Sequence, residues 1–96
     1  MVDYNKEIRN RIRLAVAAYT YEYEDVSIMS DAEFDHISYE IDPSVKTGNR
    51  KLDNFFAKYF EPATGMWVRK HSDKRGLKNI YERYYNKWGE FHQVSR

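Results

Sequence analysis

The chain has 96 residues, a length typical of one domain, and a net charge of +1. It contains no Cys, which excludes a disulfide scaffold and a thiolate metal site and favours a reducing, cytoplasmic setting. No apolar run approaches the roughly 20 residues that a membrane helix needs. Residues 1–13 are polar and charged, so we expect neither a membrane span nor a signal peptide.

The two halves of the chain differ in charge. Residues 1–45 carry −6 and residues 46–96 carry +7. The halves either complement each other, within a monomer or across a homodimer, or attract an oppositely charged partner. Aromatic residues make up 17% of the chain and include nine Tyr, whose rings often lie at a rim where they can bind something. A homodimer is possible because a small Tyr-rich domain often exposes an apolar patch.

Residues 5 to about 24 have apolar side chains at steps of three and four, the spacing of one helical face. No Gly or Pro interrupts this stretch, which predicts one long helix. Arg9, Arg11 and Arg13 lie mostly off the apolar face. That face comprises Ile8, Ile12, Ala15, Val16, Tyr19 and Tyr23.

A second helix is predicted to start after Ser30, because Glu33 follows at the spacing of a capping box. Asp31 and Glu33 place negative charge in its first turn, where the helix dipole favours it. Pro43 should end this helix, since the residue before a proline is biased out of the helical region. The expected buried stripe is Phe34, Ile37 and Ile41.

The second half of the chain predicts two more helices. A turn at residues 47–49 precedes a helix over about 50–60, which is the most apolar segment and the expected centre of the core. The apolar run at residues 66–68 is too short to separate strand from loop. After a charged connector at residues 72–76, a fourth helix is expected over about 77–88. Its stripe is Leu77, Ile80, Tyr81, Tyr84 and Trp88, with Gly89 as the C-terminal cap.

Together these patterns predict an all-α single domain, a bundle of about four helices spanning residues 1–96. It would comprise a helix pair at 5–42, an aromatic-rich helical half at 43–90 and a tail at 91–96. The rest of the domain would pack around a helix–loop–helix corner at 19–41 or extend it.

The corner at residues 19–41 suggests a small-molecule pocket. Asp31 and Asp35 are four residues apart, so they share one face of the second helix, with Phe34 beside them. Carboxylates accept hydrogen bonds from hydroxyl groups, and aromatic rings stack on flat or cationic rings. The same spacing also fits a purely structural arrangement, in which Asp31 caps the helix, Asp35 is solvated and the rings are core.

Residues 8–41 resemble the N-terminal helical subdomain of bacterial NAD-dependent DNA ligases. That subdomain carries Tyr-x-Tyr-His on one helix, an Asp in the following loop, and Asp-x-Glu-Tyr-Asp at the start of the next helix. This chain has, without a gap, Tyr19-Thr20-Tyr21-Glu22, then Asp25, then Ser30-Asp31-Ala32-Glu33-Phe34-Asp35. The resemblance implies that this region binds NAD or its nicotinamide mononucleotide half. Tyr21 and Phe34 would sandwich the nicotinamide ring, and Asp31 and Asp35 would hold ribose or amide groups.

Two residues depart from the ligase pattern. Glu22 stands where the family has the His that helps hold the phosphate, and a carboxylate there would repel it. Phe34 stands where the family has Tyr, which keeps the stacking ring and loses the hydroxyl contact. The chain has no Lys-x-Asp-Gly adenylation motif, so it is not a complete ligase. It resembles the short ligase-related proteins of bacteriophages and prophages, which implies a location in the cytoplasm of a host bacterium.

The basic residues of the second half interleave with aromatic ones, a pattern typical of single-strand binders. The candidate nucleic-acid or phosphate contacts are Arg69, Lys70, Lys74 and Arg75. A soluble helix with aromatic residues inward and basic residues outward gives the same pattern. Alternatively, these residues could supply the phosphate contacts that Glu22 cannot make.

The sequence therefore leaves three functions open. The first is a non-catalytic module that binds NAD or a related nicotinamide compound through Tyr21, Glu22, Asp31, Phe34 and Asp35, and so sequesters or senses a nucleotide. The second is a protein-interaction module, such as a phage inhibitor of a host protein. The third is a single-stranded nucleic-acid binder. The sequence shows no catalytic constellation, no His pair with metal-ligand spacing and no required cofactor.

Overall fold

Four α-helices and two shorter helical turns make up the part of the chain that the computed structural model describes, residues 3–85. The α-helices are α1 (Tyr4–Tyr19), α2 (Asp31–Glu40), α3 (Arg50–Tyr59) and α4 (Lys74–Tyr84). A π-helical turn, η1 (Thr20–Glu24), extends α1, and a 3₁₀ turn, η2 (Met66–Lys70), lies between α3 and α4. The predicted all-α fold with about four helices is confirmed.

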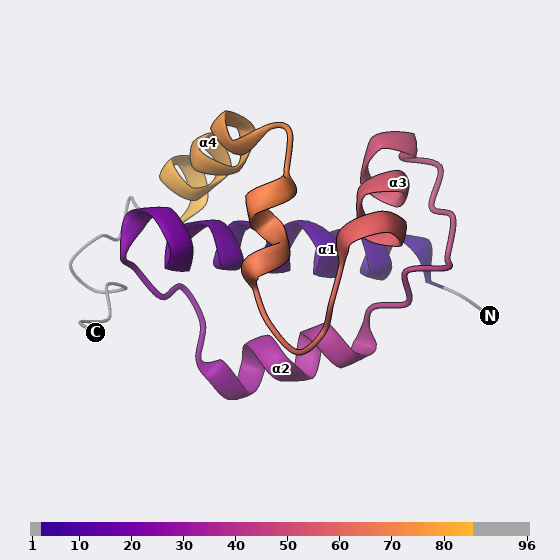
Figure 1. Cartoon of the computed structure of the whole chain (residues 1–96), viewed down its shortest axis with the longest axis horizontal. Helices are drawn as coiled ribbons and strands as arrows, with labels where there is room; N and C mark the ends of the chain where they lie inside the picture. The colour runs from indigo at the N-terminus through magenta and orange to yellow at the C-terminus, as the bar shows by residue number, and fades with distance from the viewer. Residues whose placement is uncertain (1–2, 86–96) are drawn as a thin grey trace.

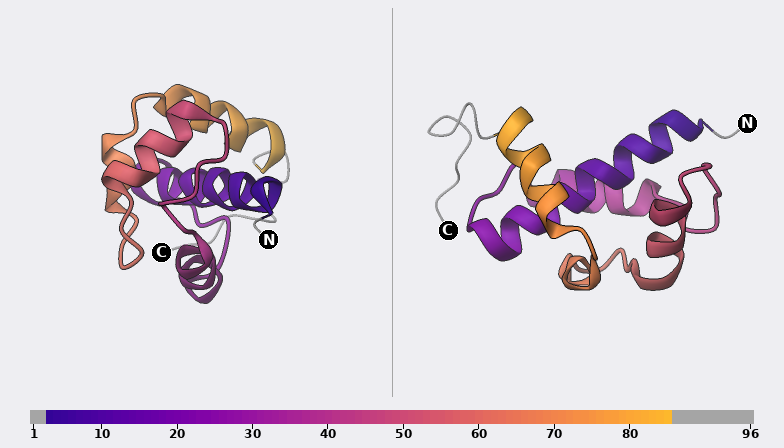
Figure 2. Two further views of the ribbon diagram at one scale, coloured as in Figure 1. Left: turned by 90° about the vertical axis from the view of Figure 1, so that its right-hand side faces the viewer. Right: turned by 90° about the horizontal axis from the view of Figure 1, so that it is seen from above.

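Helix α1 runs through the middle of the molecule. Figure 1 shows α2 on one side of α1, and α3, η2 and α4 on the other side. The left panel of Figure 2 shows the same arrangement end-on, and α1 contacts α2, η2 and α4. Within residues 3–85, no helix is long and apolar enough to cross a bilayer.

The core is centred on α1, so the prediction that residues 50–60 form its centre is wrong. Six consecutive α1 residues, 14–19, are buried, whereas Phe56 is the one fully buried apolar residue of α3. Three of the six are alanines, whose small side chains let neighbouring elements approach α1 from several sides. A helix that is surrounded in this way buries residues all round rather than along one stripe. At the far end of the predicted stripe, Tyr23 is 49% exposed.

An aromatic cluster joins α3 to η2. Its ring centroids lie 5.2–5.9 Å apart in edge-on and tilted pairs, which are favourable geometries for aromatic rings. Trp67 comes from the short run at 66–68, which forms the 3₁₀ turn. The members are Phe55, Phe56, Phe60 and Trp67.

Side-chain caps determine where the helices begin. The hydroxyl oxygen of Ser30 accepts a hydrogen bond from the Glu33 amide at 3.1 Å, as the capping-box spacing predicted. Helix α4 begins at Lys74 and not at Leu77, because the carboxylate of Asp73 accepts from the Gly76 amide at 2.9 Å. The predicted end of α4 at Trp88 and Gly89 and the predicted tail lie outside the described residues.

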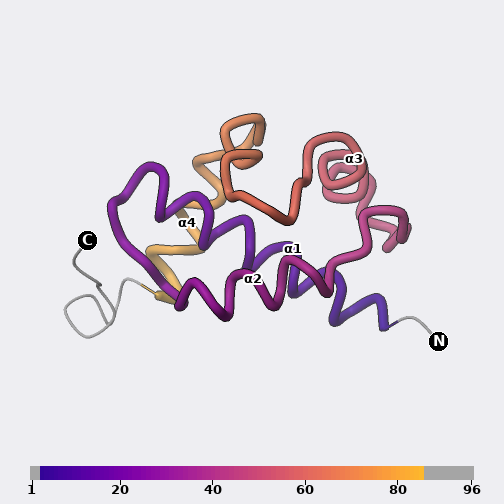
Figure 3. The backbone as a smooth tube through the Cα atoms, turned by 60° about the horizontal axis from the view of Figure 1, so that its bottom comes forward, coloured from indigo at the N-terminus to yellow at the C-terminus, as the bar shows by residue number. Residues whose placement is uncertain are grey.

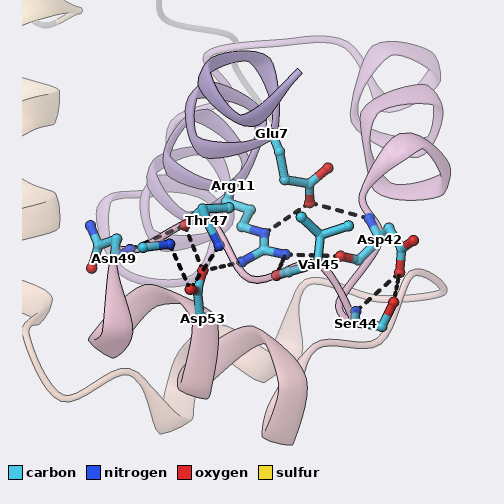
Figure 4. Close-up of polar contacts among 9 residues, drawn as sticks. Glu7, Arg11, Asp42, Ser44, Val45, Thr47, Asn49 and Asp53 are labelled. Carbon is cyan, nitrogen blue, oxygen red and sulfur yellow. Dashed lines mark hydrogen bonds and ion pairs between the residues drawn. The ribbon is translucent and has the colours of Figure 1, made fainter. Parts of the chain in front are cut away.

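Arg11 is fully buried, although it lies off the apolar face of its helix. Its guanidinium donates to Glu7 at 2.8 Å and to Asp53 at 2.9 Å (Figure 4). It also donates to the carbonyl oxygens of Asp42 and Val45, at 2.8 and 3.0 Å. One side chain thus ties α1 to the connector after α2 and to α3.

Asp53 completes this network from the first turn of α3. Its carboxylate accepts from the Thr47 hydroxyl and from the amides of Thr47 and Gly48, at 2.6, 2.8 and 3.2 Å. Gly48 has φ +96°, a left-handed conformation that the turn before α3 requires and that glycine adopts without strain. Burial alone would raise the pKa of Asp53. These hydrogen bonds and the charge of Arg11 lower the pKa by more than burial raises it, so it lies below the ordinary 3.8.

Replacing Arg11 by Ala should destabilise the protein strongly, because it leaves the buried carboxylates of Glu7 and Asp53 without their cation. We expect a loss of about 3–5 kcal/mol in the free energy of unfolding, measured by urea unfolding followed by circular dichroism. Arg9→Ala, on the exposed side of the same helix, is the matched control and should change stability by less than about 0.5 kcal/mol. Equal unfolding midpoints for the two variants would contradict the role of Arg11.

Asp53 should also make stability depend on acidic pH. Because its pKa is lowered in the folded state, the carboxylate stabilises the protein above its unfolded pKa of 3.8, and this contribution is lost as pH falls through the folded value. The stability difference between the wild type and Asp53→Asn should therefore be largest at neutral pH and narrow below pH 4. Urea unfolding of both proteins between pH 7 and pH 3 measures this, and a difference that stays constant would refute it.

Candidate functional site

A cavity of about 410 Å³ lies between the end of α1, the start of α2 and the connector that follows α3. Figure 3 shows the chain leaving α1 in a broad turn before it enters α2, and Figure 1 shows the connector after α3 dipping toward α2. The structure brings all five predicted ligand-binding residues to this cavity. It is lined by Ala17, Ala18, Tyr21, Glu22, Ser27, Ile28, Met29, Asp31, Phe34, Asp35, Ala63, Thr64, Gly65 and Met66.

The π-helical turn η1 carries Tyr21 and Glu22 to the cavity. The Val26 amide donates to the Thr20 carbonyl oxygen at 3.2 Å, and Asp25 ends the turn with φ 58°. The Tyr19 hydroxyl donates to Glu24 at 2.8 Å, which fastens the turn to the end of α1. A π-helical turn is wider than an α-helical one, and such turns occur frequently at functional sites. The sequence predicted an ordinary helix here and gave no signal for the wider turn.

Helix α2 provides two carboxylates and one ring. Asp31 and Asp35 are exposed on one face of its first half, and Phe34 is half-buried beside them. Asp31 does not cap the helix, because the Ser30 side chain does so. Within residues 3–85, no hydrogen bond or ion pair engages either carboxylate, so both can accept hydrogen bonds from a ligand.

The third wall comes from residues 63–66, which lie outside the pocket that the sequence predicts. A Cβ atom placed on Gly65 would lie 3.3 Å from Cζ of Phe34 and 3.4 Å from Cβ of Ala18. The absence of a side chain at this position lets the connector pack closely against α1 and α2. The contribution of Gly65 could not be found from sequence, because it depends on two residues from distant parts of the chain.

Arg69 lies at the edge of the site and pairs with Glu22. Its Nη2 and Nε atoms lie 2.9 and 3.0 Å from the same carboxylate oxygen of Glu22. The Glu22 side chain is 18% exposed and that of Arg69 is 54% exposed. Among the four predicted phosphate contacts, Arg69 is thus the one that reaches a residue of the cavity.

The other three predicted basic residues lie away from the lining. Lys74 donates to the carbonyl oxygens of Arg69 and His71, both at 2.9 Å, and so closes the end of η2. Lys70 and Arg75 are exposed. These three residues do not form one site with the cavity.

The cavity is acidic and partly aromatic. Among residues 3–85, three carboxylates line it, from Glu22, Asp31 and Asp35, and no Lys or Arg does. The rings of Tyr21 and Phe34 and the thioethers of Met29 and Met66 supply polarizable surface. Such a lining suits a ligand with a flat ring, hydroxyl groups and positive charge.

Two further findings concern chemistry and relatives. Among residues 3–85, no group of three or more His, Asp or Glu side chains is placed to hold a metal ion. Comparisons of this chain with protein-family models, with curated proteins and with solved structures found no match. The resemblance to the ligase subdomain therefore stays a prediction from the sequence.

Tyr19 should make stability depend on alkaline pH. Its burial, helped by the hydrogen bond to Glu24, raises its pKa to about 12, so the folded state favours the neutral phenol. This stabilisation is complete below the ordinary pKa of 10.0 and is lost as pH rises toward 12. Tyr19→Phe should cost about 1 kcal/mol at pH 8, and its deficit relative to wild type should shrink by pH 11. Urea unfolding at both values measures this, and an unchanged deficit would contradict it.

Proposed function

We propose that the protein binds a nicotinamide-containing nucleoside or nucleotide, of the kind present in NAD and nicotinamide mononucleotide, without transforming it. The observation that carries this proposal is the cavity that joins all five residues of the ligase-like pattern. They come from two elements separated by a loop, and residues 63–66, which lie outside the pattern, close the cavity around them.

The cavity has the size and the groups that such a ligand needs. A volume of about 410 Å³ lies toward the lower end of the roughly 300–1,000 Å³ typical of ligand sites, which favours a single nucleoside unit over a whole dinucleotide. The nicotinamide ring would stack against Tyr21 or Phe34, and the ribose hydroxyls would donate to Asp31 and Asp35. A protein that binds without chemistry would act by sequestering or sensing its ligand.

Replacing one carboxylate of the cavity should separate ligand binding from folding. Asp35→Asn keeps the shape of the side chain and removes the charge, so affinity for a nicotinamide nucleoside should fall tenfold or more, because hydrogen bonds to a charged acceptor are the strong ones. The measurement is isothermal titration calorimetry with nicotinamide riboside, nicotinamide mononucleotide, NAD and adenosine monophosphate. Glu33→Gln is the matched control, because Glu33 lies on the same helix and pairs with Arg13 at 3.1 Å, outside the cavity lining.

The outcomes are distinct. Binding of a nicotinamide compound that weakens in Asp35→Asn and persists in Glu33→Gln supports the proposal. Absence of binding by every compound, in protein with a cooperative unfolding transition, would overturn it. A protein retained in a pull-down would then favour the interaction module, and binding of a single-stranded oligonucleotide that weakens steeply with salt would favour the nucleic-acid binder.

A further inference from the structure

The ion pair between Glu22 and Arg69 joins a residue of the cavity lining to a cation at its edge. Glu22 belongs to the cavity lining, and Arg69 is the basic residue that contacts a lining carboxylate. This pair therefore bears on which form of the ligand is bound. The inference that follows rests on the function proposed above.

The guanidinium of Arg69 is already engaged by Glu22. Two of its nitrogen atoms contact one oxygen of Glu22, at 2.9 and 3.0 Å. A phosphate that took over Arg69 would have to displace Glu22 and leave that carboxylate unpaired in a position that is only 18% exposed. Leaving a largely buried charge unpaired is costly, so the existing pair resists this exchange.

The remaining charges of the cavity also oppose a phosphate. With Glu22 neutralised by Arg69, Asp31 and Asp35 remain as uncompensated carboxylates, and no Lys or Arg of the described residues lines the cavity. Both aspartates are exposed, so water and salt screen their repulsion in part, but their two negative charges still make a further anion unfavourable here. A positively charged ring next to carboxylates and aromatic faces is favourable for the converse reason.

We propose that the cavity selects the phosphate-free, positively charged nucleoside, and that the Glu22–Arg69 ion pair is what rejects the 5′-phosphate. The oxidised nicotinamide ring carries one positive charge when attached to ribose. Nicotinamide riboside presents that charge alone, whereas nicotinamide mononucleotide adds a phosphate. The class of ligand is therefore a cationic ribonucleoside.

Three ligands test the role of charge on the wild-type protein. Calorimetric titration should give nicotinamide riboside an affinity at least tenfold higher than that of nicotinamide mononucleotide. Reduced nicotinamide riboside, which has the same size and no charge, should bind at least fivefold more weakly than the oxidised form. The preference for the riboside over the mononucleotide should narrow as salt rises, because screening weakens the repulsion.

Two variants test the ion pair, and they have opposite expected effects. Glu22→Gln removes the carboxylate and frees Arg69, so affinity for the mononucleotide should rise tenfold or more and the preference should disappear or invert. Arg69→Gln leaves Glu22 as a third uncompensated carboxylate, so the preference for the riboside should grow. Lys70→Gln, a neighbouring exposed cation outside the lining, is the matched control and should leave the preference unchanged.

Because the two variants should change the ligand preference in opposite directions, they distinguish a role in selectivity from a purely structural role. Both variants break the same contact, so a structural effect would change the two ligands equally in both. Equal or tighter binding of the mononucleotide to the wild type, or an unchanged preference in Glu22→Gln, would overturn this inference and leave the proposed function standing. Binding of neither compound to the wild type would instead overturn the proposed function itself.

Discussion

The fold depends on one buried cation. Arg11 has no exposed side-chain surface, and its guanidinium engages two carboxylates and two carbonyl oxygens. Its partner Asp53 lies 42 positions away in the chain, so this contact fixes α3 relative to α1. The central carbon of the guanidinium also lies 5.4 Å from the centre of the Phe56 ring, which links the polar network to the aromatic cluster. The network satisfies the polar groups of a connector that packs against the core and would otherwise be costly to bury.

The cavity depends on small side chains of the same helix, whereas the polar network depends on a long one. The first half of α1 holds other segments through the charged side chains of Glu7 and Arg11, whereas near its end Ala17 and Ala18 leave space. The glycine at position 65 lets the connector close one side of this space, because the connector can lie against Ala18 and Phe34 without a side chain between them. A cavity at the surface of a 96-residue domain thus results from small residues at one end of a central helix, while the other end remains tightly connected.

The sequence predicted the elements well and the long-range contacts poorly. Ser30 and its capping box, the turn at Gly48 and the helices around residues 5–24 and 50–60 are local signals, and the structure confirms them. The burial of Arg11 has no local signal, because it depends on partners that fold next to it. The choice of the most apolar segment placed the centre of the core at α3 and not at α1, because the alanines of α1 contribute little to an apolar stripe. The five residues of the candidate site were chosen from a local pattern, whereas the wall at 63–66 and the partner of Glu22 required the fold.

The charge asymmetry of the chain has a structural explanation. Three ion pairs join the two halves: Arg11 with Asp53, Arg69 with Glu22, and Lys78 with Glu24 at 4.0 Å. In the last two the carboxylate belongs to the acidic half and the cation to the basic half, so part of the asymmetry is matched within one chain. Two of these pairs involve residues of η1, the turn that carries Tyr21 to the cavity. Since the pairing uses Glu22 and Glu24 of η1, and no cation of residues 3–85 pairs with Asp31 or Asp35 of α2, the cavity keeps a net negative charge. The ion pairs that join the basic half to η1 thus leave the two aspartates at the start of α2 as the uncompensated charges of the cavity.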